Sequence, residues 1–94
     1  GLYLAHLGPV VVGKHVKAGK NLFLRQNVTL GGNGREFGHP NLGDDVTLGA
    51  NCVVIGPVDI GSRSIIGAMS LVNKSFGEDS VLVGIPAINI RNGH

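Results

Sequence analysis

The feature that most constrains this chain is a six-residue period that runs from Val12 to Val72. Ten of its eleven positions are apolar, and a glycine directly follows seven of them. The exception, Glu36, lies in a segment typical of a loop. The positions are Val12, Ala18, Leu24, Leu30, Glu36, Leu42, Leu48, Val54, Ile60, Ile66 and Val72. A short fixed period of this kind is the signature of a solenoid.

Each hexapeptide is predicted to form one side of a three-sided prism. A short strand directs its large aliphatic residue inward, while Gly, Asn and Asp tolerate the positive φ or tight turn of a corner. Asn21, Asn27, Asp45 and Asn51 share one such phase, and the glycines share another. Three sides make a coil of about eighteen residues, and coils stack about 4.8 Å apart. The period therefore predicts an all-β chain, a parallel β-helix with a continuous aliphatic core, and leaves its hand open.

The composition excludes several other classes of protein. The 94 residues include 16 Gly and 4 Pro, and the longest stretch without either runs only from 20 to 30, so a helical bundle is excluded. The glycines show no Gly-X-Y period, which excludes collagen. Apolar runs stay far below the roughly 18 residues of a membrane span. We expect a cytoplasmic protein with no membrane partner.

Charge, histidines and the single cysteine exclude further functions. Eight Lys and Arg stand against six Asp and Glu, the basic residues are scattered, and the few aromatics offer no stacking surface, so no nucleic acid is expected. Four unevenly spaced histidines do not supply three converging ligands, so no metal is expected. Cys52 lies on an inward phase and has no disulfide partner, which predicts a buried structural thiol.

The ends of the periodic region predict the extent of the domain. The six-residue frame is already running near Leu4 and Val10, although a solenoid needs a cap before its first coil. We therefore expect one β-helix domain over residues 1–94 that lacks an N-terminal segment of the full-length protein. The phase breaks over 73–80, and 81–90 is predicted to form a final strand and cap.

One segment departs from the period without losing its phase. Leu30 and Leu42 both keep the aliphatic position, yet four glycines, at 31, 32, 34 and 38, crowd the residues between them. This composition predicts one extruded loop over about 31–41. Counting leaves open whether the loop adds one hexapeptide or extrudes two.

Three motifs resemble the serine acetyltransferase group of hexapeptide-repeat acyltransferases. They are Gln-Asn-Val-Thr-Leu-Gly-Gly at 26–32, the Gly-rich stretch that ends in His39-Pro40, and Gly-Ile-Pro-Ala at 84–87. The resemblance covers the chain from about Leu2 to Ile90. It implies a left-handed β-helix that uses acetyl-CoA. It also implies a homotrimer, or a dimer of trimers, with active sites in the clefts between neighbouring helices.

Two histidines carry the chemistry that this resemblance implies. His6 aligns with the catalytic histidine of the family, and His39 aligns with its second active-site histidine, on the extruded loop. Imidazole takes a proton near neutral pH, so it can activate a hydroxyl for direct attack on the thioester carbonyl. Backbone N–H groups or a second imidazole can stabilise the oxyanion. The structural alternatives are an inward-facing histidine at His6 and a solvated turn at His39.

The resemblance also implies a place for the cofactor. Ala50 and Ala68 follow glycines at the outer edge of the later coils, where small residues let an extended pantetheine lie along the backbone. Arg63 and Arg91 are candidates for contacts with phosphate. The alternatives are corner residues that bind no ligand and charges that remain solvated.

Two departures from the family pattern leave the acceptor open. Ala5 stands where the family has an aspartate before the catalytic histidine, and Gly38 stands where it has an arginine that helps hold the carboxylate of serine. The predicted function is acetyl-CoA-dependent O-acetylation of L-serine or of a sugar hydroxyl. The alternative is a non-catalytic β-helix, a scaffold or oligomerisation module that has lost activity.

Overall fold

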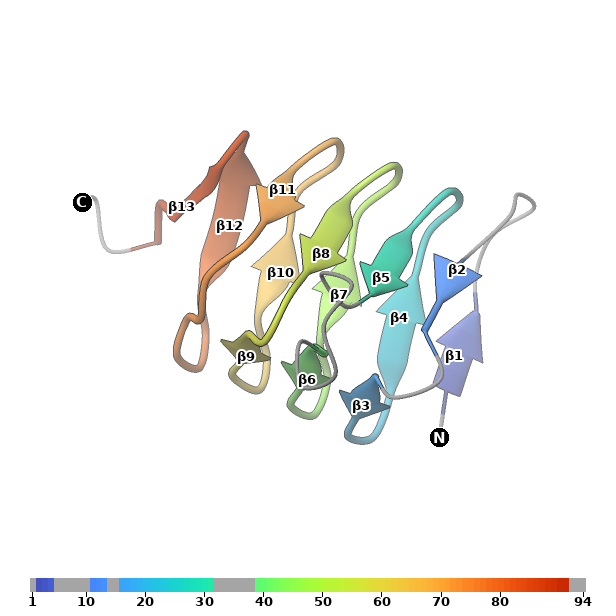
Figure 1. Cartoon of the computed structure of the whole chain (residues 1–94). Helices are drawn as coiled ribbons and strands as arrows, with labels where there is room; N and C mark the ends of the chain where they lie inside the picture. The colour runs from blue at the N-terminus through green and yellow to red at the C-terminus, as the bar shows by residue number, and fades with distance from the viewer. Residues whose placement is uncertain (1, 5–10, 14–15, 32–38, 92–94) are drawn as a thin grey trace.

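The computed structural model describes residues 2–4, 11–13, 16–31 and 39–91. Within these ranges the chain forms short strands joined by turns (Figure 1). The strands are β1 (Leu2–Leu4), β2 (Val11–Val12), β3 (Lys17–Ala18), β4 (Leu22–Leu24), β5 (Thr29–Gly31), β6 (Asn41–Leu42), β7 (Thr47–Leu48), β8 (Val53–Ile55), β9 (Asp59–Ile60), β10 (Ile65–Ile66), β11 (Leu71–Val72), β12 (Val81–Gly84) and β13 (Ala87–Asn89). No described segment forms a helix with the length and apolar character needed to cross a membrane.

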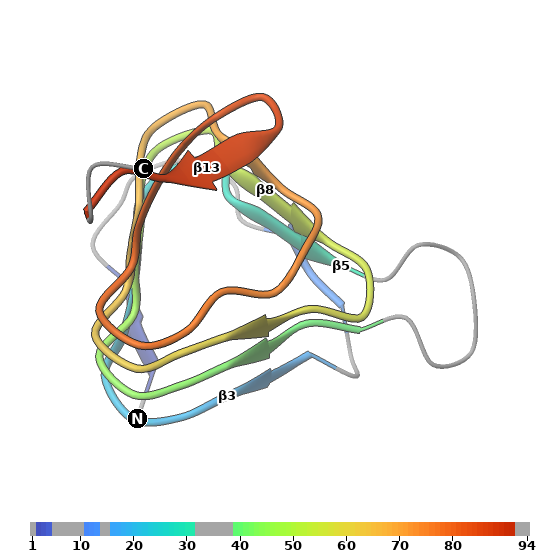
Figure 2. The same cartoon turned by 90° about the vertical axis from the view of Figure 1, so that its left-hand side faces the viewer.

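Among the described residues, the strands make three sheets that form the sides of a prism (Figure 2). Sheet A has the order β1-β4-β7-β10-β12-β13, sheet B the order β2-β5-β8-β11, and sheet C the order β3-β6-β9. All neighbours pair in parallel except β12 and β13, which form an antiparallel hairpin. The chain passes from sheet A to B to C once per coil. This arrangement confirms the predicted parallel β-helix, and the final strand and cap form the hairpin.

The aliphatic period builds the core. Leu24, Leu48 and Ile66 stack in register through sheet A, and none is more than 1% exposed. Burying each such side chain stabilises the fold by about 1.5–3 kcal/mol. Ala18 is the exception among the described positions, because it is exposed although its phase predicts an inward side chain. It lies on β3, the edge strand of sheet C, which β6 covers on one side only.

Coil length settles the size of the predicted loop. Leu42 pairs with Ile60 eighteen residues later, as the period requires. Leu24 pairs with Leu48, and this separation of 24 residues adds one hexapeptide to the coil that contains the loop. The inserted residues therefore preserve the phase. Residues 32–38 themselves lie outside the described ranges.

The first and last coils depart from the period. Ile66 pairs with Leu82 sixteen residues later, which shortens the last coil by two residues. Leu4 pairs with Leu24 twenty residues later, so Leu4 stands where the period extended backward places His6. The first coil is thus two residues longer than the regular eighteen, and the inward phase predicted for His6 falls outside the described residues.

The corners use Asn and Asp as predicted, but the glycines have a different role. Asn21, Asn27, Asp45 and Asn51 all adopt φ between 58° and 61°. Among described glycines, positive φ occurs at Gly56 and Gly84, outside the repeated glycine phase. At Gly43 a Cβ atom would lie 2.6 Å from the backbone N of Ser62 in the next coil. Glycine at this phase permits close stacking of coils rather than a left-handed turn.

Replacing Gly43 by alanine tests this role. We expect Gly43→Ala to lower the free energy of unfolding by about 1–3 kcal/mol, because the new methyl group forces two backbones apart. Urea unfolding measures the change. Gly31→Ala is the matched control, since a Cβ there meets nothing within 4 Å among the described residues. Equal destabilisation in both variants would contradict the stacking explanation.

Candidate active site

The candidate residues occupy the three corners of the prism. We name each corner by the sheets that it joins. The described segments of the A/B corner are 25–28, 49–52 and 67–70, and those of the C/A corner include 19–21, 43–46, 61–64 and 77–80. The B/C corner includes 39–40 and 56–58. Figure 2 shows the corners nearly along the axis of the helix.

His39 lies at the B/C corner, directly before β6. The backbone around it is held in sheet C, because the N–H of Lys17 donates to the carbonyl of Pro40 at 3.1 Å and the N–H of Asn41 donates to Val58 at 2.9 Å. The Pro40 side chain is fully buried, whereas His39 is half-buried. The Nδ1 atom of its imidazole is buried. The fold thus fixes the backbone of this histidine at a rim of the prism.

His6 lies outside the described residues. It belongs to the connection between β1 and β2, which leads from sheet A to sheet B. The residues before His39 connect β5 to β6, from sheet B to sheet C. In the sequence, His6 therefore follows a strand of sheet A, whereas His39 directly precedes a strand of sheet C. A side of six residues separates neighbouring corners by up to roughly 20 Å when fully extended.

Ala50 and Ala68 stack at the A/B corner. The N–H of Met69 donates to the carbonyl of Ala50 at 2.9 Å, and a Cβ on Gly49 would lie 2.6 Å from the N of Ala68. Ala50 is half-buried and Ala68 is exposed. Both side chains are single methyl groups, so they leave the backbone accessible at these two positions, although the neighbouring Met69 is 65% exposed. The geometry suits an extended ligand that runs along the helix axis.

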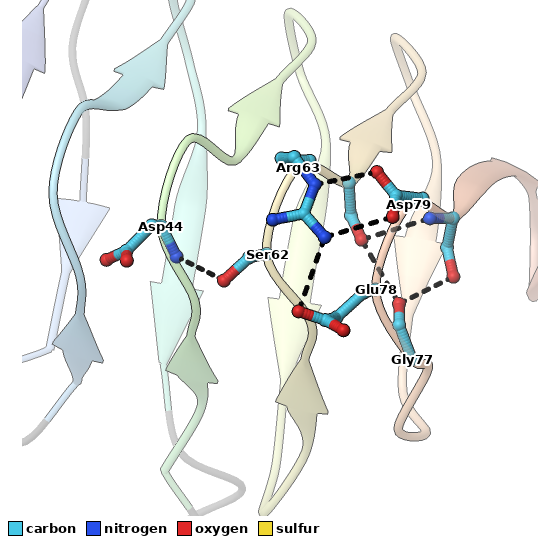
Figure 3. A network of polar contacts seen from close by, with 8 residues as sticks. Asp44, Ser62, Arg63, Gly77, Glu78 and Asp79 are labelled. Carbon is cyan, nitrogen blue, oxygen red and sulfur yellow. Dashed lines mark hydrogen bonds and ion pairs between the residues drawn. The ribbon is translucent and has the colours of Figure 1, made fainter.

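Arg63 and Arg91 lie elsewhere, at the C/A corner. The Nε of Arg63 donates to Oδ1 of Asp79 at 2.9 Å, and its Nη2 donates to Oδ2 of Asp79 at 3.1 Å and to Glu78 at 3.3 Å (Figure 3). Arg91 also acts on the Asp79 carboxylate electrostatically. The structure therefore brings the two arginines near one another but not to the corner of Ala50 and Ala68. Two carboxylates compete with any phosphate for Arg63.

The C/A corner is a stack of polar contacts between coils. The Asn21 amide donates to Asp45 at 2.9 Å, and the N–H of Asp44 donates to the Ser62 hydroxyl at 2.9 Å. Figure 3 shows how this stack continues to the Arg63 network. Most carboxylates of this corner thus have a partner in the next coil, and the corner has a structural role.

Cys52 is the buried thiol that its phase predicts. Its side chain is 0% exposed, and burial raises the pKa of the thiol to about 12. A thiol in this state is not a nucleophile near neutral pH. Across the described ranges, no group of three His, Cys, Asp or Glu is placed to hold a metal ion.

Sequence reasoning missed Arg25, which lies at the A/B corner. Its backbone N–H donates to the carbonyl of Leu48 at 3.1 Å, and its guanidinium carbon lies 5.5 Å from the centroid of the Phe23 ring. Arg25 directly follows Leu24, at the phase where Gly49 and Gly67 stand in later coils. A large cation at a phase where the sequence places glycine after seven of the eleven periodic residues was the signal.

The fold and the repeat define a left-handed hexapeptide-repeat β-helix. Residues 39–74 match the family model described as bacterial transferase hexapeptide (six repeats). A serine acetyltransferase of Staphylococcus aureus strain Mu50 is 42% identical over 87 residues, which are 90% of this chain and 41% of that protein. The resemblance predicted from the sequence motifs is thereby confirmed.

Solved structures point to the same group of proteins. The serine acetyltransferase of Neisseria gonorrhoeae in complex with serine superposes with a TM-score of 0.88 at 39% identity, covering 94% of this chain and 36% of that one. The serine acetyltransferase of Brucella abortus strain S19 in complex with coenzyme A also gives 0.88, at 35% identity, covering 95% of this chain and 36% of that one. The chain thus spans about two fifths of the length of such relatives.

The ion pairs of Arg63 predict how the pKa of the Asp79 carboxyl changes when Arg63 is replaced. The hydrogen bond and charge of Arg63 lower the pKa of the Asp79 carboxyl. A carboxyl group whose pKa is lowered in the folded state stabilises the fold at pH values above its ordinary pKa of about 3.9. This stabilisation is lost as the pH falls through the lowered pKa. We expect Arg63→Gln to raise the pKa of Asp79 toward the ordinary value, which carboxyl carbon NMR titration measures. An unchanged pKa in the variant would show that the pair does not persist in solution.

Proposed function

We propose that this chain is the β-helix domain of an acetyl-CoA-dependent O-acetyltransferase. The observation that carries the proposal is the fold match, over nearly the whole chain, to a serine acetyltransferase in complex with coenzyme A. The acceptor is a small molecule with a hydroxyl group, either L-serine or a sugar. The alternative function, a β-helix scaffold without catalytic activity, predicts that the protein does not bind acetyl-CoA.

In this proposal His6 is the general base. Its imidazole takes the proton of the acceptor hydroxyl as the oxygen attacks the thioester carbonyl. The thiolate of coenzyme A then leaves from the tetrahedral intermediate and takes this proton from the imidazolium of His6. The oxygen is acetylated directly, so no acetyl-enzyme forms and Cys52 has no role. His39 contributes as a donor to the oxyanion or to the acceptor, which lowers the barrier where negative charge develops.

We assign the pantetheine arm to the A/B corner beside Ala50 and Ala68. Their methyl side chains and the close stacking of the coils leave two small side chains one above the other, beside which an extended chain can lie. The phosphates then extend past Ala68. Arg91 and Arg63 remain candidates for contacts with them, although the pairing of Arg63 with Asp79 and Glu78 weighs against that residue.

The separation of corners supports an active site shared between copies of the chain. Ala50 and Ala68 lie at the A/B corner and His39 lies at the B/C corner, while His6 follows β1 of sheet A in the sequence. A second copy that sets its B/C corner against the A/B corner of the first joins all these groups in one cleft. A homotrimer closes this heterologous contact in a ring and contains three such clefts.

Substitution of His6 tests its proposed role. We expect His6→Ala to lower the rate of acetyl transfer by about 10²–10⁴-fold, the usual contribution of a positioned base. Release of free CoA measures the rate, and calorimetry measures acetyl-CoA binding, which should not change. Full activity in this variant would refute the assignment of the base. Absence of acetyl-CoA binding to the unmodified protein would favour the scaffold.

Mixing two inactive variants tests the shared site. His6→Ala and His39→Ala chains that are unfolded and refolded together should regain up to about a quarter of the original activity, because random assembly of a ring leaves that share of clefts with both histidines. Each variant refolded alone should stay inactive. A mixture that is as inactive as its components would place both histidines in one chain.

A further inference from the structure

Arg25 is a cation whose position the stacked coils define. It follows β4 at the A/B corner, and the hydrogen bond from its N–H to Leu48 fixes its backbone to the next coil. The side chain is exposed, and its guanidinium lies over the Phe23 ring at 5.5 Å. An arginine stacked on an aromatic ring keeps its planar edge available for hydrogen bonds.

The charge of Arg25 is isolated at this corner. In the segments 25–28, 49–52 and 67–70 it is the one charged side chain, and within the described part of the chain it forms no ion pair. The C/A corner contrasts with it. That corner holds four carboxylates against three cations, namely Asp44, Asp45, Glu78 and Asp79 against Lys20, Arg63 and Arg91. An anionic ligand is therefore attracted to the A/B corner and repelled by the C/A corner.

The position of Arg25 along the axis indicates which part of a substrate it meets. Leu4, two residues before His6 in the sequence, pairs with Leu24, directly before Arg25. The described A/B connections then follow one another along the helix as Arg25, Ala50 and Ala68. Successive coils are about 4.8 Å apart. If His6 activates the acceptor hydroxyl, the acceptor lies beside the coil of Arg25. The phosphates of coenzyme A lie at the opposite end of the pantetheine arm, beyond Ala68.

We propose that Arg25 binds a carboxylate of the acceptor. This inference rests on the proposed function and narrows its acceptor to a hydroxyl compound that carries a carboxylate, such as a hydroxy amino acid or an acidic sugar. The guanidinium forms two parallel hydrogen bonds with a planar carboxylate, which fixes the orientation as well as the position of the acceptor. Arg25 is thus a positioning residue for the acceptor and takes no part in proton transfer.

Two matched pairs of acceptors test the proposal. L-serine is compared with L-serinamide, and D-galacturonate with D-galactose, so that each pair differs in the carboxylate. We expect the unmodified protein to prefer the carboxylate member of at least one pair. Arg25→Gln should raise KM for that member by about 10–100-fold, the usual effect of losing a charge-assisted hydrogen bond. Its KM for the neutral member and its calorimetric affinity for acetyl-CoA should not change.

Two further variants separate a specific contact from general effects. Arg25→Lys keeps the charge without the planar fork and should recover part of the lost affinity. Lys20→Gln removes the same charge at the C/A corner and should leave every KM unchanged. Thermal melting checks that Arg25→Gln loses little stability, as expected for an exposed cation on a ring.

The outcomes distinguish this inference from the function on which it rests. Unchanged KM values in Arg25→Gln, or turnover of only the neutral acceptors, would overturn the inference and leave the acetyltransferase in place. Weaker binding of acetyl-CoA with an unchanged acceptor KM would assign Arg25 to the phosphates and also overturn it. A protein that binds no acetyl-CoA and acetylates none of the four compounds would overturn the proposed function and this inference together.

Discussion

The close stacking of successive coils is the constraint on which the rest of this structure depends. A chain of 94 residues with four aromatic side chains has little volume for a globular core. Here each coil buries its aliphatic residues against equivalent residues of the next, as Leu30 does with Val54, and both are 0% exposed. Backbones must approach closely for this contact, which is why Ser62 leaves no room for a side chain at Gly43. The close approach of neighbouring coils therefore explains both the packing of the core and the high glycine content.

Much of this fold could be predicted from the sequence, because a stacked coil repeats its physical requirements every six residues. Inward positions such as Leu48 must be aliphatic, and left-handed corners favour Asn or Asp, as at Asn51. Arg63 and Met69 also adopt φ near 60°, although neither residue type indicates it. At those corners the stacking of neighbouring coils imposes the conformation, so the local sequence carries no signal.

The candidate site was less predictable than the fold. The six-residue period shows which residues are equivalent within each repeat. It does not show at which corner of the prism a given residue lies, because insertions change the length of a coil. The first coil has two additional residues, so the period counted back from Leu24 does not fix the phase of the residues that follow Leu4. Arg63 had the residue type expected for phosphate binding, yet its partner Asp79 lies sixteen residues later, in a shortened coil. Which residues of neighbouring coils lie side by side becomes evident only when the register of the strands is known.

Pairing between side chains of neighbouring coils also distinguishes charged groups with a structural role from charged groups that are available to a ligand. At the C/A corner, Asp45 accepts from Asn21 and Asp79 accepts from Arg63, so these groups bond to the coils beside them. These groups already have hydrogen-bond partners before any substrate binds. A ligand must break those hydrogen bonds before it can form its own with the same groups. Arg25 rests on an aromatic ring instead, and a ring does not compete for its donors as a carboxylate does. Within a stacked fold, a cation that has no carboxylate in the neighbouring coil is therefore the better place to seek the recognition of an anion.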